Sequence, residues 1–172
     1  MENLVHEIIA IGFVRNLKAL KNNLIKARTH AENNKFAPEK YLDMKLAPDM
    51  FPLLKQIQIA TDTAKGAAAR LANAENITFQ DNETTWNEVI ERVEKTIQFV
   101  SKFKAEDFKN WTEQKITFPW YPGKALTGKD YLVGYAIPNV YFHMTTTYSM
   151  LRQCGVQIGK SDFLGEVPWI DA

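Results

Sequence analysis

Cysteine is almost absent from this sequence, since Cys154 is the single one in 172 residues and no disulfide can form within the chain. The first residues, Met1 to Asn3, lack the basic start and the apolar run of a signal peptide. No stretch is apolar over the roughly 20 residues that a membrane-spanning helix needs, because charged or amide residues interrupt every candidate. These absences predict a soluble, cytoplasmic protein that uses no disulfide.

An excess of either charge is missing as well. The chain has 21 Lys and Arg against 20 Asp and Glu, a formal net charge of +1. Proteins that bind nucleic-acid backbones or anionic lipid surfaces usually carry a basic excess, so we expect neither partner here. A chain of this length can bury about 70% of its unfolded surface without disulfides or metals, and we expect one domain over residues 1–172.

Apolar residues recur at steps of three and four along much of the chain, which is the spacing of an amphipathic helix. Four helices are therefore predicted, over residues 10–31, 49–71, 85–100 and 127–155. The first should end at Asn33, and the second should begin with Asp49 as its N-cap and Pro52 in its first turn. Thr85 and Glu88 have the spacing of a capping box and should open the third helix.

The segments between these helices carry different signals. Residues 73–83 are polar and without period, which predicts a crossover loop long enough to join parallel helices. Residues 104–128 lose the helical period and contain a Pro-Gly turn signal, which predicts a small hairpin or an irregular insertion. Pro138 should kink the last helix near Gly134, and the tail after Gly155 is expected to be irregular. The predicted fold class is all-α, a four-helix bundle with this insertion between its third and fourth helices.

The three histidines are the first candidates for chemistry. If the first helix is continuous back to His6, then His6 and His30 lie about 36 Å apart on it and cannot share a metal ion. His143 lies on the core stripe of the last helix, with Asn139 and Thr147 one turn to either side. Two interpretations stay open: a buried neutral imidazole bonded to its neighbours, or a ligand, acid or base at the floor of a pocket.

Two polar residues of the second helix are the expected neighbours of His143. If the second and fourth helices run antiparallel, counting the rise per residue places Gln58 and Asp62 at about its height. With Asn139 and Thr147, they complete a predicted ligand pocket. Asp62 has an alternative, since it is spaced to pair with Lys65 one turn later as an ordinary solvated ion pair.

Aromatic residues and the thiol give weaker signals. A row of tyrosines follows the last helix, where they could line a cavity but would more often belong to the core. The row consists of Tyr131, Tyr135, Tyr141 and Tyr148. Cys154 falls at a helix end with no cationic neighbour in the sequence, so we interpret it as a structural thiol.

Three segments of the sequence form a combined pattern: LAPDMFPLLKQIQIATDTAKGAAARL from Leu46, TGKDYL from Thr127, and PNVYFHMTTTYSMLRQCGVQIGKSDFLG from Pro138. Together they resemble an uncharacterised domain family within the DinB/YfiT-like superfamily. The resemblance covers nearly the whole chain and implies a four-helix bundle of up-down-down-up topology, often as a homodimer. Many superfamily members resemble metalloenzymes, with one His on helix two and a His-x-x-x-His pair on helix four, and some resemble thiol-dependent transferases or isomerases.

This chain departs from that metal-binding pattern. His143 falls on the second His of the pair, Asn139 on the first, and Gln58 or Asp62 on the helix-two position. A neutral carboxamide is a poor zinc ligand, so the usual three-nitrogen site cannot form from these side chains. A weaker site of His143, Asp62 and water, holding zinc or nickel, remains one hypothesis for a cofactor.

Two functions from different classes follow. The first is a non-catalytic or small-molecule-binding module, a homodimer whose metal site is degenerate and whose pocket is formed around His143. The alternative is a metal-dependent or thiol-dependent enzyme of the transferase or hydrolase type that uses the same pocket. The polar residues on the otherwise apolar stripe of the last helix support the prediction of a pocket. If these residues hydrogen-bond to one another, that would support the non-catalytic function.

Overall fold

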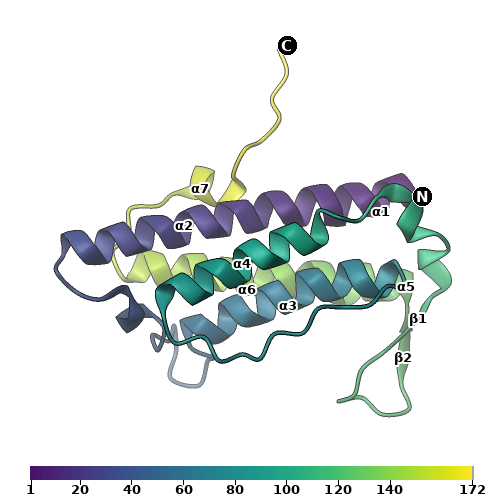
Figure 1. Ribbon diagram of the computed structural model, residues 1–172, viewed down its shortest axis with the longest axis horizontal. Helices are drawn as coiled ribbons and strands as arrows, with labels where there is room; N and C mark the ends of the chain where they lie inside the picture. Colours follow the sequence, from purple (N-terminus) through teal and green to yellow (C-terminus); the bar gives the residue numbers. More distant parts are fainter. Residues whose placement is uncertain (172) are drawn as a thin grey trace.

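A computed structural model describes residues 1–171, and almost every element in it is helical (Figure 1). Within that range, four long helices pack side by side around a common apolar core. They are α2 (Val14–Asn33), α3 (Leu53–Leu71), α4 (Trp86–Val100) and α6 (Ile137–Gln153). The helical prediction is confirmed, and the differences lie at helix ends and in the short elements between the helices.

The first predicted helix is one continuous helical run. A short α1 (Glu2–His6) leads through a π-helical segment (Glu7–Phe13) into α2. The run ends at Asn33 as predicted, and the Asn34 side chain satisfies one of the last carbonyls by donating to the His30 oxygen at 2.8 Å. A 3₁₀ turn then begins with the next proline, at Pro38–Tyr41, because that residue's fixed φ suits a first turn.

The expected start of the second helix at Asp49 is wrong, since α3 begins at Leu53. Pro52 has an extended backbone, with φ −67° and ψ 165°, and serves as the N-cap residue without a side-chain cap. The helix can therefore start only after it. The alanines of α3, among them Ala60, Ala64 and Ala67, are fully buried, which lets neighbouring helices approach closely.

The polar segment between α3 and α4 is a long irregular connection, as predicted. Figure 1 shows it running back along the length of α3, so that α4 begins at the same end as α3. The capping box at the start of α4 is confirmed: Thr85 Oγ1 accepts from the Glu88 N–H at 3.3 Å, and the Glu88 carboxylate accepts from the Thr85 N–H at 2.9 Å. Backbone N–H groups of Thr84 and Thr85 lower the pKa of Glu88 to about 2.

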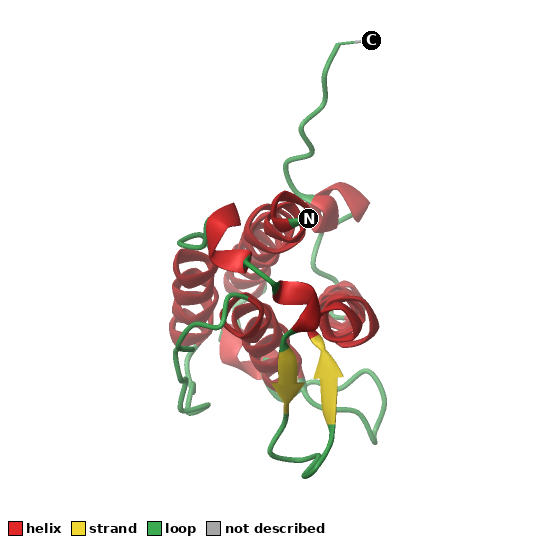
Figure 2. Cartoon of the chain, turned by 90° about the vertical axis from the view of Figure 1, so that its right-hand side faces the viewer, coloured by secondary structure: helices red, strands yellow, loops and turns green. Residues whose placement is uncertain are grey.

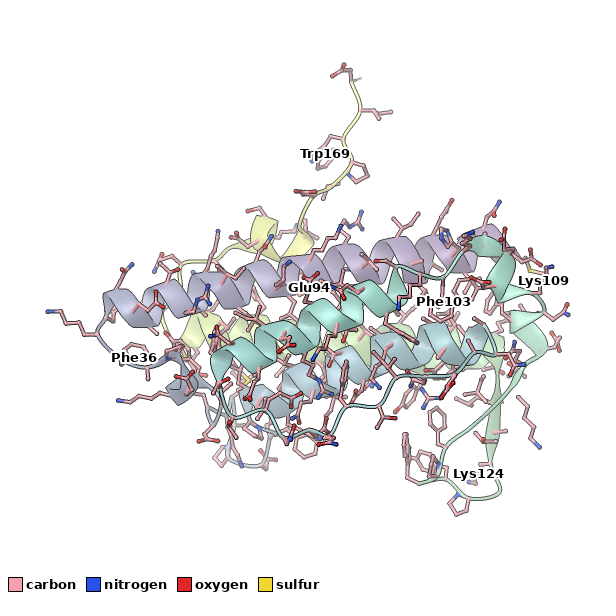
Figure 3. All side chains as sticks on the ribbon, in the orientation of Figure 1. Phe36, Glu94, Phe103, Lys109, Lys124 and Trp169 are labelled. Carbon is pink, nitrogen blue, oxygen red and sulfur yellow. The ribbon has the colours of Figure 1, made fainter. Side chains whose placement is uncertain are left out.

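The insertion after α4 contains the predicted hairpin. β1 (Lys115–Thr117) pairs antiparallel with β2 (Ala125–Thr127), which places Ile116 opposite Leu126 (Figure 2). Gly123 in the connection has a φ of 76°, a conformation that favours glycine. Short 3₁₀ turns at residues 105–108 and 111–113 precede the hairpin. The hairpin extends away from the helices, and Lys124 near its tip is labelled in Figure 3.

The last helix is irregular where proline predicted it to be, but the irregularity is a π turn. After α5 (Gly128–Tyr131) the chain forms a π-helical segment (Leu132–Ala136) and then α6. Pro138 has no N–H for the Gly134 carbonyl, so regular pairing fails there and the wider turn takes up the mismatch.

The chain beyond α6 holds a helix that was not expected. α7 (Lys160–Leu164) is too short to show a period, and Asp162 stabilises it by accepting from the Gly159 N–H at 2.7 Å and pairing with Lys26. The tail then leaves the helices, with Trp169 86% exposed (Figure 3). In the part of the chain described here, no helix has both the length and the apolar character that crossing a bilayer requires.

Candidate functional site

His143 is buried between α3 and α6, with only 7% of the residue exposed. Its Nδ1 lies 2.6 Å from Gln56 Oε1, and Gln56 in turn donates from Nε2 to the Phe51 carbonyl at 3.0 Å. Because an amide oxygen can only accept, Nδ1 carries the proton and Nε2 keeps a lone pair. Burial lowers the pKa of His143 below its ordinary value of 6.5, which favours the neutral ring.

The other two polar residues predicted on α6 have partners of their own. Asn139 donates from Nδ2 to Thr63 Oγ1 on α3 at 2.8 Å. Thr147 donates to the His143 carbonyl one turn earlier at 2.9 Å, and it lines a different, narrow cavity next to α2 that also includes Asn16. The structure therefore does not bring Thr147 to the same opening as Asn139.

Gln58 and Asp62 lie on α3 but bond to α4 and its preceding loop. Gln58 donates to Glu83 at 2.9 Å, while Asp62 pairs with Arg92 at 2.8 Å and with Lys65 at 3.2 Å. Successive residues of an α-helix are rotated by about 100°, so counting the rise per residue left their direction open. The residue that reaches His143 is Gln56, two positions before Gln58.

Arg92 is the centre of the polar network that holds this loop. Its side chain is 1% exposed and pairs with Asp62, Asp81 and Glu83, at distances between 2.7 and 2.8 Å. The ring of Phe79 lies 4.5 Å from the guanidinium carbon. One buried cation of α4 thus binds one carboxylate on α3 and two on the loop, which attaches the loop to both helices.

The donor set between α3 and α6 does not fit the three-ligand metal site that the family resemblance implies. On α3, Gln56, Ile59 and Thr63 fall on one face by their spacing, and two of them bond to α6. The facing residues of α6 are Asn139 and His143, and His143 is the one side chain of the whole set that offers an imidazole nitrogen. Among residues 1–171, no three or more His, Cys, Asp or Glu side chains are grouped so that they could hold a metal ion.

Asn139 and Asp62 do share a pocket, which lies between α3, α6 and the segment around the hairpin. Its volume is about 370 Å³, within the range of small-molecule sites. Thr63 and the pair of tyrosines Tyr131 and Tyr135 also line it. Two of the four tyrosines of the last helix thus line this pocket, although Tyr131 is completely buried, and Tyr148 lines the narrow cavity next to α2.

Arg70, near the end of α3, provides the positive charge of this pocket. Its guanidinium carbon lies 5.3 Å from the ring centre of Phe118 and 5.9 Å from that of Tyr131. Nη1 donates to the Tyr131 hydroxyl at 3.3 Å. Burial raises the pKa of Tyr131 and Arg70 opposes that rise, so the hydroxyl stays protonated at neutral pH.

Sequence reasoning missed Arg70, Phe118 and Trp120 as residues of the pocket. Phe118 and Trp120 belong to a short aromatic cluster after β1, and only the folded hairpin places them beside the end of α3. A usable signal was nevertheless present, because Gly66 interrupts an alanine-rich helix one turn before Arg70. Glycine costs about 1 kcal/mol relative to alanine in a helix interior, so its presence there indicates a close approach.

Comparison with known proteins agrees with the arrangement of the helices. Residues 5–164 match a family model described as a domain of unknown function, DUF1993. The crystal structure of a DinB family member protein from Shewanella denitrificans matches with a TM-score of 0.95 and 36% sequence identity, covering 99% of this chain and 97% of that chain. None of the curated proteins matches this chain. The fold is therefore DinB-like.

Proposed function

Because the chain belongs to the DUF1993 family of domains of unknown function, we propose its function from the site: it is a non-catalytic module that binds a small molecule between α3, α6 and the hairpin. The convergence of Arg70, Asn139 and Tyr135 on one pocket of about 370 Å³ carries this proposal. A few polar groups within aromatic walls are the usual composition of a ligand site.

The chemistry of the lining residues supports binding rather than catalysis. Asp62 is already paired with Arg92 and Lys65, and Thr63 accepts a hydrogen bond from Asn139. Covalent catalysis needs a nucleophile activated by a nearby base. No Cys, His or Ser lines this pocket, and its Lys65 is paired with Asp62 and donates to the Ile77 carbonyl. The side chains can orient a ligand, but they offer no activated nucleophile to attack it.

His143 belongs to this proposal as the remnant of a metal site. Its Nε2 lone pair is the one donor that matches the pattern of the family resemblance, while Gln56 occupies Nδ1. The companion ligand predicted from the sequence, Asp62, is occupied by Arg92. These contacts support a degenerate site rather than the alternative enzyme that depends on a metal. We also propose that the protein is a cytoplasmic homodimer. Within each chain, we propose that the four long helices have the up-down-down-up topology.

The test is a thermal-melt screen of small molecules with the parent protein and two matched variants. Ile59→Trp fills the pocket, because Ile59 is a half-buried residue of its lining. Ile25→Trp is the control, because Ile25 is also half-buried on a long helix and lines none of the pockets described here. We expect hits that stabilise the parent and Ile25→Trp but not Ile59→Trp, since only bound ligand raises the melting temperature.

Two results would count against the proposal. A screen that yields no stabilising compound sensitive to Ile59→Trp would remove the pocket as the ligand site. The second result is turnover of a hit, measured as loss of the compound by mass spectrometry. If Ile59→Trp abolished this turnover, the pocket would be an enzyme's active site rather than the site of a binding module.

A further inference from the structure

We propose that the ligand of this pocket is an organic anion, whose carboxylate or phosphate pairs with Arg70 and whose planar apolar part lies against the aromatic wall of Trp120 and Tyr135. The inference rests on the proposed function and names the chemical class of its ligand. Four observations support it: the unpaired charge of Arg70, the glycine beneath it, the exposed ring at the pocket mouth, and the neutralised acid inside.

Arg70 is a half-buried cation without an acidic partner. Among residues 1–171, no carboxylate lies within ion-pairing distance of its guanidinium. Its single side-chain hydrogen bond goes to the Tyr131 hydroxyl, which leaves most of its N–H donors for another acceptor. The planar guanidinium binds carboxylate or phosphate through two parallel hydrogen bonds, so an anion is its natural partner.

Gly66 explains how Arg70 is held in place. A Cβ atom at position 66 would lie 2.2 Å from Arg70 Nη1, closer than real contacts allow. The guanidinium therefore lies close to the backbone of α3 at Gly66, one turn before its own Cα, with the ring centres of Phe118 and Tyr131 5.3 and 5.9 Å from its carbon. Alanine at this position would favour the helix but would require the end of the Arg70 side chain to move, so glycine leaves room for the guanidinium where it lies.

The aromatic wall provides the apolar part of the site. Phe118 is buried and lies 5.0 Å from the ring of Trp120 and 5.1 Å from that of Tyr135. Trp120 is 57% exposed and lines the pocket, so part of a large aromatic residue is accessible there. An exposed aromatic ring beside an unpaired arginine can contact a planar group while the arginine binds its acidic substituent.

The acid within the pocket does not cancel this charge. Asp62 lies between two cations, Arg92 at 2.8 Å and Lys65 at 3.2 Å, so its charge is already neutralised. Lys65 also donates to the Ile77 carbonyl at 2.8 Å and is only 6% exposed. The local balance of the pocket is therefore positive, which favours an anion over a neutral or cationic ligand.

Three probes of similar shape separate the charge of the ligand from its ring. Benzoate and phenyl phosphate carry the two candidate acidic groups, and benzamide is the neutral counterpart of benzoate. Dissociation constants are measured by two-dimensional NMR titration. We expect one or both anions to bind at least tenfold more tightly than benzamide, and the tighter anion distinguishes a carboxylate site from a phosphate site.

Two variants and one control assign the effect to Arg70. Arg70→Gln removes the charge, and Gly66→Ala displaces the guanidinium without removing it. Both should weaken the anions at least tenfold and leave benzamide unchanged, and Gly66→Ala should keep or raise the melting temperature because alanine is the better helix former. Lys124→Gln removes a cation near the tip of the hairpin, outside the pocket, and should bind all three probes as the parent does (Figure 3).

The result separates this inference from the proposed function. The inference of an anionic ligand would be overturned if benzoate and phenyl phosphate bound no more tightly than benzamide. It would also be overturned if Arg70→Gln or Gly66→Ala left the affinity for the anions unchanged. In either case, neutral hits that are lost in Ile59→Trp would leave the pocket standing as a ligand site. Absence of every ligand sensitive to Ile59→Trp would overturn both.

Discussion

Replacing Arg92 with methionine should destabilise the protein more than any exposed charge substitution. The Arg92 side chain is 1% exposed and pairs with three carboxylates, on Asp62, Asp81 and Glu83. Its Nε also donates to Thr61 Oγ1 at 2.8 Å. Methionine keeps much of the length of the side chain but leaves these acids without their shared cation.

The size of the loss depends on which partners each acid retains after Arg92 is replaced. Glu83 is 10% exposed and retains only Gln58, so its charge is left buried with a neutral partner. Asp81 retains Lys55 and water. Removing one partner of a buried ion pair costs about 3–5 kcal/mol, and because the other acids are partly solvated we expect a loss near the lower limit, about 3 kcal/mol. For a chain of this size that corresponds to a melting temperature lower by about 6–12 °C.

Lys21→Met is the matched control. The Lys21–Glu94 pair has the same 2.8 Å separation as the Arg92–Asp62 pair, but its side chains are 30% and 38% exposed. A solvated pair of this kind contributes less than about 1 kcal/mol. Urea unfolding followed by circular dichroism gives both free energies of unfolding. Losses within 1 kcal/mol of each other in the two variants would refute the reasoning that burial, rather than distance, decides the strength of these pairs.

Arg92→Met should also change the pH dependence of the free energy of unfolding. Partial burial opposes ionisation of Asp81 and Glu83, but hydrogen bonds from Lys55 to Asp81 and from Arg92 to both hold their pKa values below the ordinary range. The unfolded chain therefore takes up protons first as the pH falls. This stabilisation is complete above about pH 5, roughly one unit above the pKa values of the acids in the unfolded chain, and is lost on further acidification. Arg92→Met should flatten that acidic limb, and an unchanged limb would contradict the assignment.

Two further predictions concern His143 and the assembly. Burial lowers the pKa of His143, so the unfolded chain binds its proton first; stability should fall as the pH drops below about 6.5, and His143→Gln should remove part of that loss in urea titrations from pH 7 to 5. The ring should titrate below 6.5 by NMR, and a higher midpoint would refute its burial as a neutral group. Light scattering should give nearly twice the 19.7 kDa mass of the chain, whereas a monomer at every concentration would contradict the homodimer.

The sequence predicted the elements with strong local signals. The end of α2 at Asn33, the capping box of Thr85 and Glu88, and the hairpin each depend on residues close together in the chain. The start of α3 was misplaced because Asp49 offers a cap while the extended Pro52 delays the helix. α7 was missed because its stability comes from Asp162 reaching Lys26 on α2, a contact that no local pattern contains.

The candidate site was predictable in part. The helical stripe correctly indicated a buried His143, but counting helical rise did not identify Gln56, the residue of α3 that bonds to it. The direction of Gln58 and Asp62 was not available, because rotation about α3 depends on how all four long helices pack. The hydrogen bond from Asn139 to Thr63 likewise shows a pairing that only the contact between α3 and α6 selects.

By itself, the sequence determined which long segments are helical, where proline disturbs the last of them, and that the buried face of this last helix carries one imidazole. Those properties depend on neighbours within about a turn of the chain. The tertiary structure decided that Arg92 binds the acids around it, leaving none for Arg70, and that the hairpin brings Phe118 beside α3. Charge pairing and pocket shape are set by distances between residues far apart in sequence, and folding alone defines those distances.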